Sequence, residues 1–214
     1  MGPLQTFPIS SDQSNSAATI AIAIDFTSAN SYLALAPAIE LAEELEVEIQ
    51  LLPFRVLQNS VPDVEDNESD SQHHKRIRAE YRQWETNQYA RVRGIELIAD
   101  PVGIDPTLAH LGLILASDRS LGKEYSQQVF RLFWTKKLDL ECEHQLLSVL
   151  QSIGIEPHES LHEFRPQLME LRNELLDAEV FAVPTFLVSG ERFVGRQHLR
   201  IIRRLLTESG QSPI

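Results

Sequence analysis

The sequence of 214 residues contains a single cysteine, Cys142. No intrachain disulfide can form, and dithiol–disulfide exchange is excluded because that chemistry needs an attacking and a resolving thiol. Glu141 and Glu143 flank this cysteine and disfavour its thiolate, so we expect an unreactive helix residue. Cys142 together with His144 is also too small a set for a zinc site.

Long apolar runs are missing, and none approaches the roughly 20 residues that a membrane span needs. Basic residues are scarce, with 19 Lys and Arg against 31 Asp and Glu and a net charge of −12. This argues against nucleic acid as a partner, because its phosphates are bound by Lys and Arg. Residues 1–18 lack the basic and apolar segments of a secretory signal, and we expect a disordered arm. These absences favour a cytoplasmic enzyme or binding protein that does not contact a membrane.

The chain is organised around residues 20–36, which have the sequence IAIAIDFTSANSYLALA. Residues 20–24 form a short apolar run typical of a strand buried on both faces. A polar turn at 25–30 leads into a helix predicted from residue 31 to about residue 46. The first turn of a helix has free N–H groups and a partial positive charge, so it stabilises an anion such as a thiolate.

The remaining pattern divides the chain into a sheet and a helical block. Polar and apolar residues alternate over residues 47–54, which predicts a second strand. Strand, helix and strand together make a parallel βαβ unit. The acid-rich loop at 60–72, followed by His73 and His74, is better explained as exposed than as a metal site, because its carboxylates have no fixed scaffold. Helices are predicted at 77–94, 106–121, 123–136, 139–153 and 157–178, followed by a hairpin at 183–188 and 191–194 and a closing helix at 197–208.

The predicted fold is therefore α/β, with a thioredoxin-like βαβ…ββα sheet and an inserted all-helical domain. We expect a disordered arm at 1–18, a thioredoxin-like domain at 19–59 and 179–214, and the helical domain at 60–178. Four large aromatic residues are expected in the core rather than in a substrate wall: Trp84, Phe130, Phe133 and Trp134.

Two motifs carry a family resemblance that spans about residues 18–207. The pattern D-F-x-S-x-x-S-Y-L-A, which begins at Asp25, resembles the active-site turn of the DsbA-like branch of the thioredoxin superfamily. It is most similar to the 2-hydroxychromene-2-carboxylate isomerases and the kappa-class glutathione transferases. The stretch FAVPTF at 181–186 is close to the G-V-P-T-F of that family. Ser28 and Ser31 stand where disulfide oxidoreductases carry their two cysteines, so Ser-Ala-Asn-Ser replaces the CxxC motif.

The resemblance implies a site at these two motifs. It implies that Ser28 is catalytic and holds the glutathione sulfur as a thiolate by donating a hydrogen bond. It also implies a cis bond between Val183 and Pro184, which exposes the Val183 backbone to pair with glutathione as an added strand would. The residues alone leave open an N-cap at Ser31, a turn role for Ser28 and a trans proline. The other expected glutathione contacts are Ser31, Asn59, Arg196 and Gln197, supported by Tyr81 and Glu85.

The sequence departs from the family pattern at 195–198, which reads Gly-Arg-Gln-His. The family carries an Asp there that binds the γ-glutamyl end of glutathione. Gln197 can accept a hydrogen bond from an ammonium group but lacks charge, whereas Arg196 and His198 suit a carboxylate. Ala29 also replaces a proline that often follows the first serine.

These observations leave three functional hypotheses. The first is a glutathione-dependent isomerase or transferase that acts on a small aromatic electrophile, with glutathione as cofactor and a homodimer as the assembly that the family often forms. The second is a non-catalytic binding or dimerising module of the same fold. The third is a protein disulfide oxidoreductase, which only the family label suggests. The missing cysteines argue against it.

Overall fold

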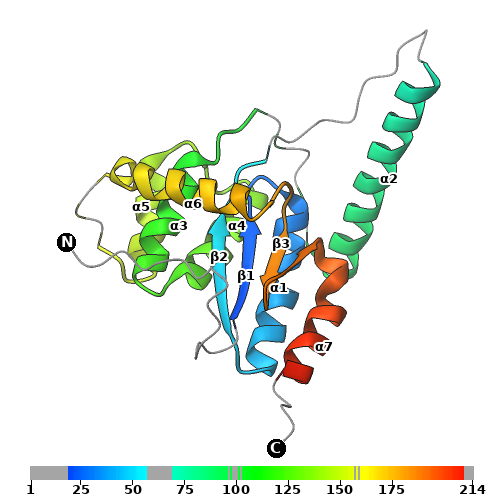
Figure 1. Ribbon diagram of the computed structural model, residues 1–214. Helices are drawn as coiled ribbons and strands as arrows, with labels where there is room; N and C mark the ends of the chain where they lie inside the picture. Colours follow the sequence, from blue (N-terminus) through cyan, green and yellow to red (C-terminus); the bar gives the residue numbers. More distant parts are fainter. Residues whose placement is uncertain are drawn as a thin grey trace, which may run out of the picture.

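The computed structural model describes residues 19–56, 69–95, 97, 101, 103–156, 158 and 160–209. Its sheet has the strand order β2-β1-β3-β4. Strands β1 and β2 are parallel, and β3 is antiparallel to β1 and to β4. The predicted α/β class with a βαβ unit and a C-terminal hairpin is confirmed (Figure 1). The strands are β1 (Thr19–Ile24), β2 (Glu48–Pro53), β3 (Thr185–Val188) and β4 (Glu191–Val194).

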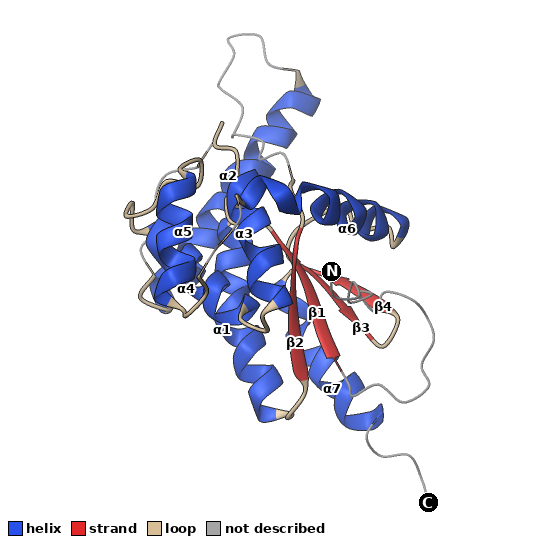
Figure 2. Cartoon of the chain, turned by 90° about the vertical axis from the view of Figure 1, so that its left-hand side faces the viewer, coloured by secondary structure: helices blue, strands red, loops and turns tan. Residues whose placement is uncertain are grey.

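Seven helices and two short 3₁₀ turns are found in the described parts of the chain. Helices α3, α4 and α5 gather beyond the β2 edge of the sheet (Figure 2), whereas α2 stands apart on the other side (Figure 1). The division into domains at 60 and 178 stays a prediction, and the expected arm at 1–18 lies outside the described residues. The helices are α1 (Ala29–Glu44), α2 (Asp70–Val92), α3 (Thr107–Asp118), α4 (Gly122–Trp134), α5 (Glu143–Ser152), η1 (Leu161–Phe164), α6 (Arg165–Asp177), η2 (Arg196–His198) and α7 (Leu199–Ser209).

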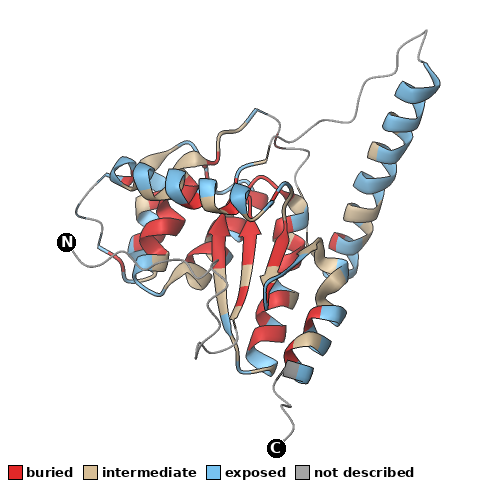
Figure 3. Ribbon diagram, viewed as in Figure 1, coloured by how far each residue is buried: buried red, intermediate tan, exposed pale blue. Residues whose placement is uncertain are grey.

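The central strand β1 is buried on both faces, as its apolar run predicts (Figure 3). Successive side chains of a strand point to opposite faces. Ile20, Ile22 and Ile24 enter a core that also contains residues of α1, α3, α4 and α7. Ala23 belongs to a second core cluster, which contains residues of β2 and α6. Helices therefore cover both faces of the sheet, and the polar turn that follows β1 is buried as well.

Several helices do not begin where the sequence predicts. α1 begins at Ala29, so the N-cap is Ser28 and not Ser31. α2 begins at Asp70 rather than at residue 77, because Ser69 and Gln72 form a capping box. Placing 70–72 in a loop was therefore wrong, and the acidic positions at 57–68 lie outside the described residues. α5 begins at Glu143, which makes the half-buried Cys142 its N-cap residue.

One of the four expected core aromatics is misplaced. Phe130, Phe133 and Trp134 are buried, which confirms the prediction for these three. Trp84 is 56% exposed, so its placement in the core was wrong. Helical spacing tells which residues share a face but not whether another element covers that face.

Candidate functional site

The site is built on the N-terminus of α1, which follows β1 after a short turn. Ser28 has an extended backbone, and its Oγ accepts a hydrogen bond from the Ser31 backbone N–H at 3.2 Å. Serine suits this position because its short side chain reaches the free N–H groups of the first turn. The hydroxyl accepts in this contact, so its own proton stays available for an external acceptor. Ser28 is only 5% exposed, so a ligand must approach it closely.

The turn beneath Ser28 is held by the buried side chain of Asp25. Its Oδ1 accepts hydrogen bonds from the Thr27 backbone N–H at 2.9 Å and from Thr27 Oγ1 at 2.8 Å. Its Oδ2 accepts a hydrogen bond from the Val56 N–H at 3.0 Å, just beyond β2. The fully buried Ser31 completes the turn, because its Oγ accepts a hydrogen bond from the Asp25 N–H at 3.3 Å. Ser31 therefore supports the turn and presents no exposed surface to a ligand.

The second predicted motif lies at the same end of the sheet. Thr185, the first residue of β3, pairs with Ala23 of β1. The residues that precede β3 therefore lie next to the turn that follows β1. The Val183–Pro184 peptide bond is cis, and Pro184 is buried. Val183 is half-buried, and its backbone N–H and C=O have no hydrogen-bond partner in the described part of the chain. Ser28 and Val183, 155 positions apart in the sequence, therefore lie at the same end of the sheet.

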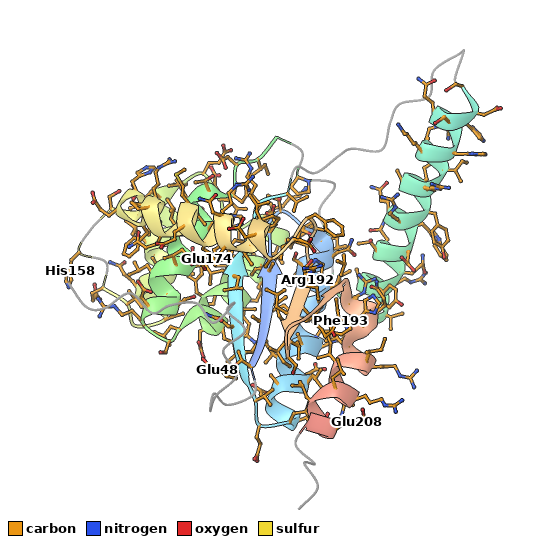
Figure 4. The ribbon with its side chains drawn as sticks, in the orientation of Figure 1. Glu48, His158, Glu174, Arg192, Phe193 and Glu208 are labelled. Carbon is orange, nitrogen blue, oxygen red and sulfur yellow. The ribbon has the colours of Figure 1, made fainter. Side chains whose placement is uncertain are left out.

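A third segment reaches the site from β4. The Gly195 N–H donates a hydrogen bond to the Pro184 carbonyl oxygen at 2.8 Å, which fixes η2 beside the cis peptide. Figure 4 shows Phe193 on β4 near the start of α7, and its ring centroid is 5.9 Å from that of His198. Gly195 has φ of +93°, and a Cβ there would clash with Gln197 Oε1. Glycine is therefore required at the entry to η2.

Arg196 joins three elements at the rim of the site. Its Nη1 donates a hydrogen bond to Asn30 Oδ1 on α1 at 2.7 Å, and its guanidinium lies 3.9 Å from the ring centroid of Tyr89 on α2. Burial lowers the pKa of Arg196, while nearby Tyr89 and Glu85 act in the opposite direction. Its Nε is buried and has no hydrogen-bond partner among the described residues.

The side chain of the exposed Gln197, on η2, is turned back toward β4. Its Nε2 donates a hydrogen bond to the Val194 carbonyl oxygen at 2.8 Å. Arg196 and Gln197 also border a hollow of about 180 Å³ between α1, α2 and the start of α7. The other lining residues are Leu33, Pro37, Tyr89, Arg93 and Leu199.

The remaining predicted residues fall into two groups. Asn59 lies outside the described residues. Tyr81 is 58% exposed on α2, and Glu85 is half-buried on the same helix. Asn30 and Tyr89 were not predicted, although Asn30 lies inside the Ser-Ala-Asn-Ser stretch that pointed to the site. Their roles depend on contacts with Arg196, which no local sequence pattern reveals.

No cluster of three or more His, Cys, Asp or Glu side chains that could hold a metal is found within the described ranges. No described helix is long and apolar enough to cross a membrane.

Known proteins share this fold. The model of the family described as DSBA-like thioredoxin domain matches residues 19–207. A solved 2-hydroxychromene-2-carboxylate isomerase is 17% identical, with a TM-score of 0.64 over 90% of this chain and 96% of its own. A probable DsbA oxidoreductase from Streptomyces coelicolor is 15% identical, with a TM-score of 0.65 over 92% of each chain.

A third solved structure was determined with GSH. The cytosolic disulfide reductase DsbM from Pseudomonas aeruginosa with GSH is 14% identical, with a TM-score of 0.61 over 91% of this chain and all of its own. No curated protein sequence matches this chain. The family match covers most of the chain and both motifs of the site, so this protein belongs to the DSBA-like thioredoxin domain family.

Proposed function

We propose that this protein is a glutathione-dependent isomerase or transferase acting on a small aromatic electrophile. The observation that carries the proposal is the Ser28 hydroxyl, which caps α1 through its oxygen and keeps its proton for an external acceptor. Bound glutathione would supply a sulfur nucleophile for an electrophilic carbon. Glutathione acts in this way only in its reduced, thiol form. The proposal therefore places the protein in the cytoplasm, where thiols are kept reduced.

The residues of the site have complementary tasks in this proposal. Ser28 donates a hydrogen bond to the sulfur, and the N-terminus of α1 stabilises its negative charge. The free N–H and C=O of Val183 pair with the extended backbone of the tripeptide, as an added strand would. The buried Nε of Arg196 lacks an acceptor, which fits a carboxylate at this rim of the site.

The choice against disulfide exchange rests on this chain's own residues. The two positions that would carry the reactive thiols are Ser28 and Ser31, and Cys142 lies far along the chain at the N-cap of α5. A serine hydroxyl cannot form the mixed disulfide through which thiol exchange proceeds. The isomerase neighbour and the neighbour solved with GSH support the glutathione hypothesis by likeness of fold.

A second function, a non-catalytic binding module, is favoured by one specific observation. Arg196 is already bonded to Asn30, and Gln197 is bonded to Val194. Both side chains expected to bind glutathione therefore have partners within the chain. A ligand that uses them must exchange these hydrogen bonds, which reduces the net gain from each new one.

Calorimetry and kinetics with three proteins test the proposal. The wild type should bind glutathione in the millimolar range or tighter and convert an activated aryl electrophile in a glutathione-dependent reaction. Ser28→Ala should lower kcat by roughly 10- to 1000-fold, the effect of losing one stabilising donor. Ser28→Thr, which keeps the hydroxyl and the cap, is the matched control and should retain most of the activity.

The outcomes separate the two functions. Glutathione binding without turnover of any electrophile tested would assign the protein to the binding module. An absence of heat at millimolar glutathione would remove the cofactor from the proposal. If the wild type has a glutathione-dependent activity and Ser28→Ala has the same kcat, Ser28 takes no part in the chemical step.

A further inference from the structure

Helices α1 and α2 meet at two places, and the hollow of about 180 Å³ lies between these places. At the first, Thr86 Oγ1 of α2 lies 3.4 Å from Asn30 Oδ1 of α1. At the second, further along both helices, Arg93 Nη1 lies 3.7 Å from Glu40 Oε1. Each helix advances by about 1.5 Å per residue, so the two places are roughly 10 to 15 Å apart. This interval is long enough to hold a small molecule.

The side of the hollow that α1 forms is apolar. Leu33 and Pro37 line the hollow and follow Asn30 by three and seven positions, so all three residues share one face of the helix. Leu199, at the start of α7, adds a further apolar side chain. Tyr89 of α2 supplies an aromatic wall on the other side. The apolar part of a ligand would therefore be surrounded by aliphatic and aromatic carbon.

Two arginines supply the polar side of the hollow. The 3.7 Å between Arg93 and Glu40 is longer than a hydrogen bond, so Arg93 can donate to a better placed acceptor. Arg196 uses Nη1 to bond Asn30, and its Nη2 makes no hydrogen bond within the described part of the chain. The hollow thus offers guanidinium N–H groups next to an apolar surface.

These features fit one small organic anion. A cavity of about 150 Å³ holds a benzene ring, and a planar carboxylate matches the fork of N–H groups on a guanidinium. Glu40 near Arg93 and Glu85 near Arg196 offset part of the positive charge, which favours a singly charged group over a phosphate dianion. We propose that this hollow binds a small monocarboxylate with an apolar body, of about the size of benzoate.

The hollow is separate from the position that a thiolate would take at Ser28. Leu33 and Pro37 follow Ser28 by five and nine positions in the sequence, so they lie about 8 Å and 14 Å further along α1. Reacting atoms must approach each other to about 3.5 Å. A molecule seated in the hollow is out of reach of a sulfur at Ser28, so the hollow takes a second ligand and not the reacting substrate. This assignment does not depend on glutathione as the cofactor.

Titration of the full ¹⁵N-labelled chain with sodium benzoate at constant ionic strength tests the site. Amide chemical shifts should change in segments 33–37, 89–93 and 195–199, with a Kd of about 1 mM or tighter. Benzamide has nearly the same shape without the charge and should bind at least about 10-fold more weakly. Inorganic phosphate, which has no apolar body, should also bind more weakly than benzoate.

Three variants at exposed positions separate a binding role from a structural one. Arg93→Gln should weaken benzoate binding at least about 10-fold, the effect of losing a hydrogen bond to a charged group. Arg91→Gln removes the same charge two positions away, on the other side of α2, and should change the Kd by less than about twofold. Glu40→Gln removes the carboxylate that competes for Arg93, so it should tighten binding by about two- to fivefold. A gain in affinity cannot come from misfolding, so Glu40→Gln tests the site even if Arg93→Gln destabilises α2.

Four outcomes would overturn the proposal. The first is an absence of shift changes in these segments up to about 10 mM benzoate, where even weak binding is visible. The second is equal binding of benzoate and benzamide, or of benzoate to Arg93→Gln and Arg91→Gln. The third is tighter binding of phosphate than of benzoate, which would assign the hollow to phosphate. The fourth is a set of shift changes centred on Ser28 and Val183, or loss of bound benzoate when glutathione is added, which would place benzoate in the site at Ser28.

Discussion

His110 Nε2 lies 3.8 Å from Asp25 Oδ1 in the interior of the protein, and both side chains are almost fully buried. Asp25 belongs to the turn that carries Ser28, and His110 comes from α3 in the helical block. Burial lowers the pKa of His110 and outweighs the attraction of Asp25, so the imidazole is neutral at neutral pH. The contact is therefore no ion pair, and His110 Nε2 lacks a hydrogen-bond partner within the described residues.

The lowered pKa of His110 predicts a loss of stability in acid. The unfolded chain takes up a proton near pH 6.5, whereas folded His110 does so only at lower pH. The contribution of His110 to the free energy of unfolding is fully present above pH 6.5. It is lost as the pH falls from there through the pKa of folded His110, by up to about 1.4 kcal/mol per pH unit. Arg55 strengthens this effect, while Asp25 and Asp105 oppose it.

Urea unfolding of the wild type and His110→Gln at several pH values checks this prediction. Glutamine is polar but does not titrate, so the variant should lose less stability than the wild type between pH 7 and pH 5. The other histidines are common to both proteins, and their contributions cancel in the comparison. Parallel pH profiles for the two proteins would show that His110 does not titrate differently on folding.

The parts of the fold that the sequence predicted depend on local patterns. The apolar run of β1, the turn after it and the hairpin at the C-terminus each lie within a few residues, so periodicity and turn residues reveal them. The capping box of Ser69 and Gln72 is equally local, but the acidic residues that precede it favoured the prediction of a loop. Its signal, Ser followed three residues later by Gln, is present in the sequence.

The rest depends on contacts between distant segments. The bond between Arg196 and Asn30 joins positions 166 residues apart, and Trp134 Nε1 donates a hydrogen bond to the Phe26 carbonyl oxygen across 108 positions. Neither contact leaves a pattern in the residues next to it. The exposure of Trp84 is a similar case, because burial depends on which element covers a helix face.

Gly195 should be the least replaceable glycine of the site. Alanine there must adopt φ of +93° and also displace the Gln197 side chain. Gly154 is a matched control, with φ of +90° and no atom within 4 Å of an added Cβ. We expect Gly154→Ala to cost about 1 kcal/mol of unfolding free energy and Gly195→Ala about 1 kcal/mol more, since Gln197 must then give up its hydrogen bond to Val194. Adding Gln197→Ala to Gly195→Ala should recover part of the difference, and no recovery would contradict the contact.

Arg196 should fix the position of α2 through its planar guanidinium. Lysine cannot both cover the Tyr89 ring and donate to Asn30, so Arg196→Lys should cost about 1 kcal/mol. Hydrogen exchange in the last turns of α2 should become faster than in the wild type. Arg200→Lys, at an exposed position one turn along the chain, is the control and should change neither quantity. Equal exchange in both variants would mean that Arg196 does not hold α2.

The final prediction concerns the electrostatics of the α1 N-terminus, without reference to any ligand. In a Cys142→Ser background, Ser28→Cys places a sulfur where the Ser31 N–H donates. Two effects oppose each other there, because burial raises a thiol pKa whereas N–H donors and the helix dipole lower it.

We expect the donors to prevail, because the N-terminal N–H groups lie in the first turn, next to the sulfur. The introduced thiol should then titrate at least about one pH unit below the ordinary value of about 8.5. Ser148→Cys in the same background, at an exposed position in the middle of α5, is the control and should titrate near 8.5. Thiolate absorbance against pH measures both. A thiol at position 28 that titrates at or above the control would show that burial prevails, and it would remove the electrostatic basis for holding any thiolate at this helix terminus.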